Sequence, residues 1–387
     1  MAAAVIVDAI RTAGGKRNGK LRDWHPVDLA SEVLAALVER NDLDPALVED
    51  VIMGCALQVG EQGANVGRCA ALAAGFPESV VGTTIDRQCG SSQQAAHFAA
   101  QGVMAGAYDI VIAAGVESMT RVPLGSSVKN GPGKAFGEKM VHRYAAVGGL
   151  VNQGISAEMI AEKWVLSRDA LDTFSVESHQ RAQRATDEGR FDNEIVPIAV
   201  KSDSGIHDRD EGIRPDCNVE ALGRLQPAYR PDGRITAGNS SQITDGAAAV
   251  LIMSEEAASR LGLRARARFH SFALAGVDPV MMLTGPIPAT AKALERAGMT
   301  IDDLDAIEIN EAFASVVLAW EQELHPDMSK VNVNGGAIAL GHPLGCSGAK
   351  LLATLLNELE RSNGRYGLQT MCEGGGMANA TIIERLA

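Results

Sequence analysis

The chain has 387 residues, a formal net charge of −13 at pH 7 and 46% hydrophobic residues. This composition is typical of a globular protein with a large core, and the acidic balance argues against nucleic acid or an anionic membrane as a partner. No run of about 18 apolar residues predicts a membrane span. The opening sequence MAAAVIVDAIRT resembles a buried strand and lacks the basic flank of a signal peptide.

The first part of the chain alternates helices and strands. Apolar spacing predicts a helix over residues 26–40, a strand ending at Cys55, a helix opened by the glycine turn at Cys89, and a strand ending at Gly115.

Residues 118–244 interrupt this alternation. The segment begins with a basic stretch in which a single acid, Glu138, faces five cations: Arg121, Lys129, Lys134, Lys139 and Arg143. That stretch is either a solvated loop or a contact for an anionic ligand or a second subunit. Ser167 is a good N-cap for a following helix, and residues 225–253 return to turns and a buried strand. We interpret the insertion as a lid or loop domain.

The last part repeats the order of the first. A helix is expected over residues 288–299, then a strand ending at Asn310, a glycine turn opening a helix at Cys346, and a strand running into Gly374. Strands alternating with helices predict parallel strands joined by right-handed crossovers. We expect a duplicated α/β unit packed back to back, with Gly- and Ala-rich helices between two sheets.

The six cysteines are too few for a disulfide scaffold, and none forms a C-x-x-C pair, so reduced thiols in the cytoplasm are expected. They are Cys55, Cys69, Cys89, Cys217, Cys346 and Cys372. His342 lies close to Cys346 in NGGAIALGHPLGCSGAK, residues 334–350. This pair supplies only two of the four ligands of a structural zinc, and Lys350 stands too late for a phosphate-binding loop.

Cys89 is a better candidate for chemistry. A thiol at the start of a helix faces unpaired N–H groups, which would lower its pKa and could also bind an oxyanion. The alternative is a small buried residue in a tight turn. His342, fixed between glycine and proline, suits an immobilised base. Asn310 and Cys372 end predicted strands, where ligands of α/β proteins gather.

Six motifs resemble, in order, those of the thiolase family, the acetyl-CoA acyltransferases: QCGSSQQAA, AAGVESM, TAGNSSQITDGAAAV, INEAFAS, NGGAIALGHPLGCSGAK and MCEGGGM. The resemblance runs from VIVDAIRTAGGKRNG to the C-terminus. It implies the thiolase fold, a five-layered αβαβα core of duplicated α/β units with an inserted loop domain. The implied parts are residues 1–117 with about 245–265, then 118–244, and finally 266–387.

The resemblance also implies roles for individual residues. Cys89 matches the acylated nucleophile, and His342 matches the base that activates it. Cys372 matches the acid/base that moves the proton of the acetyl carbon. Asn310 matches the residue holding the water of a first oxyanion site. The backbone N–H groups of Cys89 and Gly374 match a second oxyanion site.

Coenzyme A is the implied co-substrate, and no metal or permanently bound cofactor is implied. Ser241 matches a contact to the pantetheine arm. Arg214, Leu225 and Tyr229 fall where the loop domain of the family holds the CoA nucleotide. CoA thioesters are the expected partners, and a homodimer or homotetramer is the expected assembly. Whether the protein also binds a hydratase/dehydrogenase partner stays open.

The implied reaction is CoA-dependent cleavage of a 3-ketoacyl-CoA by ping-pong kinetics, in a degradative pathway for fatty acids or sterol side chains. Asn152 stands where biosynthetic acetoacetyl-CoA members carry histidine, and Glu373 occupies a position that is normally apolar or small. Three alternatives stay open: a biosynthetic acetoacetyl-CoA thiolase, a ketoacyl synthase, which would lack the second catalytic cysteine, and a non-catalytic lipid-binding relative. Cys346 occupies the helix-opening position of Cys89 in the other repeat, so we expect no catalytic role for it.

Overall fold

The protein is described by a computed structural model over residues 3–129, 132–202 and 204–386. Within these residues, eleven strands form one hydrogen-bonded sheet. Its main path runs in the order β4 (Val81–Ile85), β3 (Asp50–Gly54), β5 (Ile110–Ser118), β9 (Thr244–Ser254), β1 (Ala4–Thr12), β10 (Ala267–Gly276), β13 (Met377–Arg385), β12 (Tyr366–Glu373) and β11 (Ala306–Ile309). Off this path, β2 (Gly15–Lys16) pairs with β9 and β6 (Ile195–Val196) with β1. A separate ribbon joins β7 (Ile198–Ala199) to β8 (Ile206–His207).

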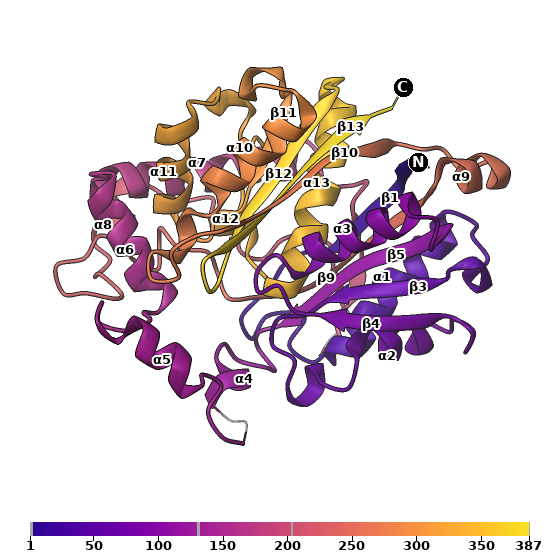
Figure 1. The fold of residues 1–387 in the computed structure, drawn as a ribbon, viewed down its shortest axis with the longest axis horizontal. Helices are drawn as coiled ribbons and strands as arrows, with labels where there is room; N and C mark the ends of the chain where they lie inside the picture. The colour runs from indigo at the N-terminus through magenta and orange to yellow at the C-terminus, as the bar shows by residue number, and fades with distance from the viewer. Residues whose placement is uncertain (1–2, 130–131, 203, 387) are drawn as a thin grey trace.

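The sheet consists of two half-sheets with the same internal order. The series β3, β5, β9, β1 corresponds to β11, β12, β13, β10, which confirms the expected duplication. A short antiparallel contact of β1 with β10 joins the halves into one ladder, so the two sheets are continuous. In Figure 1 the strands β1, β3, β4 and β5 of the N-terminal half are indigo to purple, and the strands β11, β12 and β13 of the C-terminal half are orange to yellow.

The expectation of parallel strands holds for only part of each half. Strands β3, β4 and β5 are mutually parallel, as are β11 and β12, but β9 and β13 run antiparallel to both neighbours. For β13 the reason is the connection: it follows β12 after the three glycines 374–376, and such a tight turn can join only antiparallel strands.

Helices complete five layers, as the thiolase resemblance implies (Figure 1). One outer layer holds α1 (Pro26–Arg40) and α2 (Val66–Ala73), and the other holds α10 (Pro286–Ala297) and α11 (Ala314–Leu324). Between the half-sheets lie α3 (Ser91–Met104) and α13 (Ser347–Ser362), whose Ala and Leu side chains share one core cluster with residues of both halves.

The middle helices approach each other closely at their N-terminal turns. The Ser92 hydroxyl accepts a hydrogen bond from the Ala349 N–H at 2.9 Å. Gly348 packs so tightly on α3 that a Cβ there would collide with the backbone nitrogen of Gln93. This contact places the start of α3, and therefore Cys89, beside the start of α13.

Local sequence signals located several elements well. The predicted helix 26–40 is α1, with proline in its first turn, and Ser167 caps α7 (Arg168–Asp187) by accepting from the Ala170 N–H at 3.1 Å. The strand predicted to end at Gly115 continues to Ser118 as β5.

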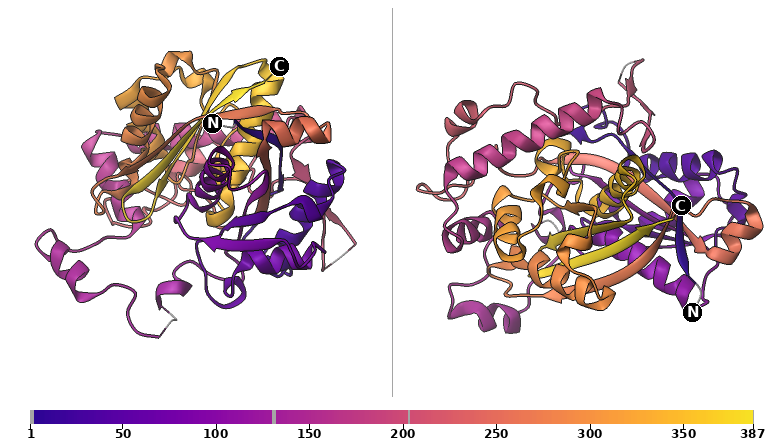
Figure 2. Two further views of the ribbon diagram at one scale, coloured as in Figure 1. Left: turned by 45° about the vertical axis from the view of Figure 1, so that its right-hand side comes forward. Right: turned by 90° about the horizontal axis from the view of Figure 1, so that it is seen from above.

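The insertion contributes helices to one outer face and extends beyond it. Helices α6 (Gln153–Lys163) and α7 pack with α11 in the core of the C-terminal half. The basic stretch forms α4 (Ser126–Lys129) and α5 (Glu138–Ala145), which project from the body (Figure 2). The remaining helices are α8 (Val219–Gly223), α9 (Glu255–Leu261) and α12 (Ala337–Leu340). No described helix is long and apolar enough to span a bilayer, and the three-part division at residues 118 and 244 stays a prediction.

Gly348→Ala tests the contact between the middle helices. The added methyl group must push α13 away from Gln93, and overpacking of this kind costs about 1–3 kcal/mol. We expect a lower free energy of unfolding in urea denaturation. Gly223→Ala in α8 is the control, because its Cβ would meet nothing within 4 Å. Equal stability of the two variants would contradict the role of Gly348.

Candidate active site

Cys89 sits in a strained turn between β4 and α3. Gln88 has a φ of 52°, in the left-handed region that non-glycine residues rarely adopt. Asp86 Oδ1 holds it by accepting from the Gln88 N–H at 2.7 Å. The Ser91 hydroxyl accepts from the Arg87 N–H at 2.9 Å and donates to the Gln88 carbonyl at 2.6 Å. These bonds fix the thiol at the N-terminal end of α3.

The Cys89 thiol is almost completely enclosed. The backbone N–H of Gly374 and the side chain of Gln153 face its sulfur and act to lower the pKa of the thiol. Burial, followed by the negative charge that Glu373 carries when it is ionised, raises the pKa of the Cys89 thiol to about 12. The expectation that the helix start would lower this pKa is therefore wrong: desolvation of a fully buried thiolate outweighs the donors that face it.

Cys372 lies at the end of β12 and completes a pair of thiols. It is fully buried. Burial raises the pKa of the Cys372 thiol well above the ordinary value, and repulsion from Cys89 in its thiolate form raises it further. The structure thus brings together Cys89, Cys372 and Gly374, and both thiols are neutral in the resting protein.

His342 is held in one tautomer. Its Nδ1 lies 2.6 Å from the Ser347 hydroxyl, which donates its own proton to the Pro343 carbonyl at 2.8 Å. Nδ1 must therefore carry the ring proton, and Nε2 presents a lone pair, which accepts from Asn310 Nδ2 at 3.3 Å. Burial, and then the charge of Lys350, lower the pKa of His342 to about 3. The imidazole is a neutral base.

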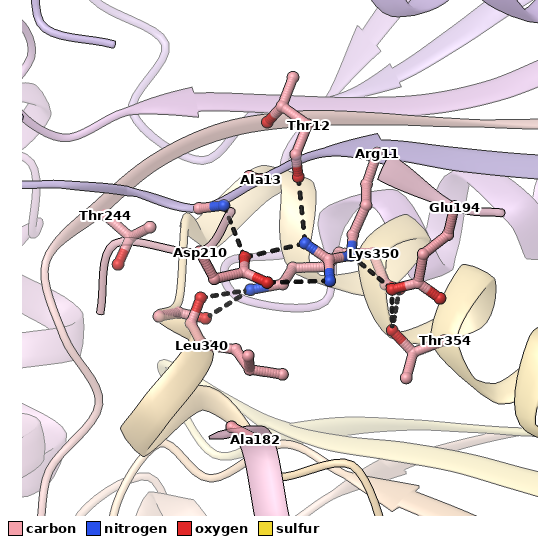
Figure 3. Close-up of polar contacts among 12 residues, drawn as sticks. Arg11, Thr12, Ala13, Ala182, Glu194, Asp210, Thr244, Leu340, Lys350 and Thr354 are labelled. Atoms are coloured by element: carbon pink, nitrogen blue, oxygen red, sulfur yellow. Dashed lines mark hydrogen bonds and ion pairs between the residues drawn. The ribbon is translucent and has the colours of Figure 1, made fainter. Parts of the chain in front are cut away.

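Lys350 holds the loop that carries His342. The Lys350 ammonium donates to the carbonyls of Leu340 at 2.6 Å and Gly341 at 3.1 Å (Figure 3). Thr244 Oγ1 accepts from the His342 N–H at 3.2 Å. Backbone carbonyls and N–H groups on both sides of the imidazole are therefore paired.

Asn310 follows β11, and its backbone N–H donates to the Thr370 carbonyl of β12 at 3.0 Å. The next residue, Glu311, accepts from the Ser178 hydroxyl at 2.6 Å and from the Ile338 N–H at 3.1 Å. Glu311 thus ties the Asn310 segment to the glycine-rich loop that leads to His342.

The thiol pair and the imidazole–amide pair lie on adjacent strand ends. Strands β11 and β12 are paired in register at Ile309 and Thr370, so Asn310 and Cys372 emerge at the same edge. Leu344 packs on the core cluster that contains Cys89. Among the described residues, no direct hydrogen bond joins Cys89 to His342.

Two of the four proposed CoA contacts lie beside this site. The Ser241 N–H donates to the Ala312 carbonyl at 2.9 Å, and the Tyr229 ring lies edge-on to Phe313 at 6.2 Å. Arg214 and Leu225 lie elsewhere in the insertion. The Arg214 N–H donates to His179 at 3.1 Å, and the Leu225 carbonyl accepts from Arg168 at 3.1 Å. Among the described residues, no hydrogen bond joins either residue to Cys89 or Cys372.

Three residues of this site were not identified from the sequence: Gln153, Ser347 and Lys350. Gln153 is the first residue of α6, which Asn152 caps by accepting from the Ile155 N–H at 3.0 Å. The N-cap pattern could have located this helix start. The sequence presents Ser347 only as part of a motif and Lys350 only as a possible phosphate ligand.

Cys346 is separated from His342 despite their closeness in sequence. It forms the N-cap of α13 and is buried in the core cluster of the middle layer, where its Cα packs against Gly115. No group of three His, Cys, Asp or Glu side chains in the described ranges could hold a metal ion.

Comparisons with known proteins agree with this architecture. Residues 4–256 match the N-terminal domain of thiolase, and residues 263–385 match its C-terminal domain. The chain is 52% identical to the steroid 3-ketoacyl-CoA thiolase FadA6 of Mycobacterium tuberculosis, over 100% of this chain and 95% of that protein. It is 48% identical to the 3-ketoacyl-CoA thiolase of Psychrobacter cryohalolentis, over 99% and 98% of the two chains. The crystal structure of the Bacillus anthracis acetyl-CoA acetyltransferase superposes with a TM-score of 0.91 at 40% identity, over 100% and 99%.

A duplicated five-layered fold with these matches defines an acyl-transferring enzyme. The chain belongs to the thiolase family. The expectations of a thiolase fold and of an acyltransferase, drawn from the motifs, are confirmed.

Ser347→Ala should weaken the base without unfolding the protein. Without the hydroxyl, the His342 Nδ1–H loses its acceptor and the ring loses its orientation. We expect kcat to fall by part of the factor of about 10²–10⁴ that a positioned general base contributes. Steady-state thiolysis rates measure this effect. Ser362→Ala, in the last turn of the same helix, is the control and should keep the wild-type kcat. Equal rates for both variants would contradict the proposed role of Ser347.

Cys346→Ala should retain most activity, because Cys346 lies in the core and not beside the cysteine pair. Cys372→Ala should lose nearly all activity under the same assay. Comparable losses in the two variants would show that the separation of Cys346 from the site is incorrect.

Proposed function

We propose that the protein is a degradative 3-ketoacyl-CoA thiolase that uses Cys89, His342, Cys372 and Asn310 in catalysis. The observation that carries the proposal is a pair of buried neutral thiols at the same sheet edge as a neutral imidazole, whose Nε2 carries a lone pair that accepts from Asn310 and can take up a proton. Cleavage of a 3-ketoacyl-CoA requires this combination of one nucleophile, one base and one acid.

In the first half-reaction, the Cys89 sulfur attacks the 3-keto carbon while its proton moves to His342 Nε2. Since the thiol pKa is raised by burial, the proton leaves in step with bond formation rather than before it. The developing oxyanion accepts hydrogen bonds from His342 and from a water held by Asn310. The bond between C2 and C3 then breaks, and the acetyl-CoA enolate takes its proton from the Cys372 thiol.

In the second half-reaction, the Cys372 thiolate takes the proton of free CoA, and the CoA sulfur attacks the thioester on Cys89. The carbonyl oxygen of that thioester develops negative charge near the N–H groups of Cys89 and Gly374. Collapse expels the Cys89 sulfur, which recovers its proton from His342. Each half-reaction is balanced in protons, and the shared acyl-enzyme gives ping-pong kinetics.

Coenzyme A is proposed to enter over the insertion, with its pantetheine arm at Ser241 and Tyr229. Both residues contact the segment that carries Asn310, which supports this path. The nucleotide end is proposed to reach Arg214 and Leu225. No metal or permanently bound cofactor takes part in the proposed mechanism.

A bulky acyl chain is the proposed substrate class, either a fatty or a sterol side chain. A relative named as a steroid thiolase supports this choice. A biosynthetic acetoacetyl-CoA thiolase is the second candidate, favoured by the structural likeness to an acetyl-CoA acetyltransferase. Asn152 weighs against this second candidate. It stands where biosynthetic members carry histidine, and in this structure it serves as the N-cap of α6.

The six cysteines are free thiols, which supports a reducing compartment, the cytoplasm. A homodimer or homotetramer is proposed because β4 is an edge strand with the exposed side chain of Val81, and because apolar side chains on α4 and α5 are exposed. A hydratase/dehydrogenase partner is a further proposal for the same exposed surface.

Mass spectrometry after one turnover without free CoA tests the proposal. With a 3-ketoacyl-CoA, we expect an acyl adduct on the peptide of Cys89, with the mass of the substrate shortened by its acetyl unit. Long-chain and steroidal substrates should label faster than acetoacetyl-CoA, and the reverse order would favour the biosynthetic candidate. Folded Cys89→Ala should show neither adduct nor thiolysis. Normal turnover by that variant would refute covalent catalysis at Cys89.

A further inference from the structure

Glu373 is a buried ionisable group that the proposed mechanism does not use. It follows Cys372 on β12, and no part of it is exposed. Alternation along the strand turns its side chain toward the middle layer, where it lies against the turn that follows Cys89. A Cβ at Gly90 would collide with Glu373 Oε1, so only glycine at this position leaves room for the carboxyl group.

The two carboxyl oxygens of Glu373 have different surroundings. With its amide oriented to satisfy its neighbours, Asn379 of β13 donates to Oε1 and accepts from the Gln94 N–H at 3.3 Å. Oε2 is buried and has no hydrogen-bond partner among the described residues. A buried carboxylate with one oxygen unpaired is costly, whereas a protonated acid carries no charge to desolvate.

The charged and titratable groups around Glu373 do not compensate a negative charge. Burial raises its pKa, the Arg87 guanidinium lowers it, Asp86 raises it again, and the result is about 9. The strand and the turn packed on it contribute the neutral thiols Cys372 and Cys89. From β13 and α3, the Asn379 amide and the Gln94 N–H face this region. The imidazole of His97, also on α3, is neutral, because burial and then the charge of Arg87 lower its pKa to about 3. The geometry and the charges agree on a protonated side chain at neutral pH.

We propose that Glu373 is a positioning residue that supports the Gly90 turn as a neutral acid and thereby keeps the Cys89 pocket free of negative charge. When Glu373 loses its proton in alkaline solution, the carboxylate disfavours the Cys89 thiolate. This proposal rests on the proposed role of Cys89 as the nucleophile.

The sign of the effect follows from Coulomb repulsion. An ionised Glu373 raises the pKa of the Cys89 thiol, so the thiolate fraction falls relative to a protein without that charge. Glutamine has the same shape, keeps an oxygen for Asn379 and never ionises. Wild type and Glu373→Gln should therefore behave alike below pH 8 and diverge above pH 9.

The test is the rate of alkylation by iodoacetamide between pH 6 and pH 10, followed on the Cys89 peptide by mass spectrometry. Iodoacetamide reacts with the thiolate, so the rate reports its population. At pH 10 we expect Cys89 of Glu373→Gln to react up to about tenfold faster than wild type, since a shift of one pKa unit is a factor of ten. At pH 7 the two rates should be equal.

Asp86→Asn is the matched control, because it removes the other nearby carboxylate and keeps the oxygen that binds the Gln88 N–H. Its alkylation rate should flatten near pH 9 as that of the wild type does. The proposal is overturned if the pH profiles of alkylation of wild type and Glu373→Gln coincide. It is also overturned if only Asp86→Asn, and not Glu373→Gln, removes the difference from the faster alkaline rate.

The wild-type profile provides a second measurement that needs no variant. Its rise with pH should flatten near pH 9, and a constant slope through pH 10 would also overturn the proposal. Failure of the proposed function is distinguishable: thiolysis that persists after complete alkylation of Cys89 would refute the nucleophile, whatever the pH profile shows.

Discussion

One buried guanidinium, that of Arg11, holds together three parts of the chain. It lies on β1, donates to Glu194 at 2.6 Å and binds both oxygens of Asp210 at 2.9 and 3.1 Å (Figure 3). Glu194 also accepts from Thr354 of α13 at 2.9 Å. Burial alone would lower the pKa of Arg11, but the two carboxylates raise it, so the charge persists in the core. Loss of one partner from such a pair costs about 3–5 kcal/mol, because a charge is then left unpaired.

The same charged cluster reaches the loop of His342, the proposed catalytic base. Lys350 is attracted by Asp210 and holds the carbonyls of Leu340 and Gly341, directly before His342. A buried cation near the ring favours its neutral form. The charged cluster therefore helps both to position the loop of His342 and to keep the His342 ring neutral. The insertion, which supplies Asp210, takes part in this arrangement although it lies outside the duplicated core.

Features governed by neighbouring residues could be predicted from the sequence, and features governed by packing could not. The helix over residues 26–40 and the order of the motifs could be predicted, because helix caps, turns and apolar periodicity depend on residues that are close together in the sequence. The low pKa expected for Cys89 was wrong because burial is a property of the whole fold. Gln153 was missed because a helix start does not reveal where its side chain points, and Lys350 because its partner Asp210 is distant in the chain.

The position of β1 has a consequence for how the chain folds as it is synthesised. Its two main partners, β9 and β10, come from residues 244–254 and 267–276, so the strand made first is paired late. At about 5–20 residues per second, a ribosome needs on the order of 10–50 s to supply them. Until then the apolar residues of β1 lie in a nascent chain without their final neighbours. Pairing of β1 is thus complete only after β9 and the first residues of β10 have been synthesised.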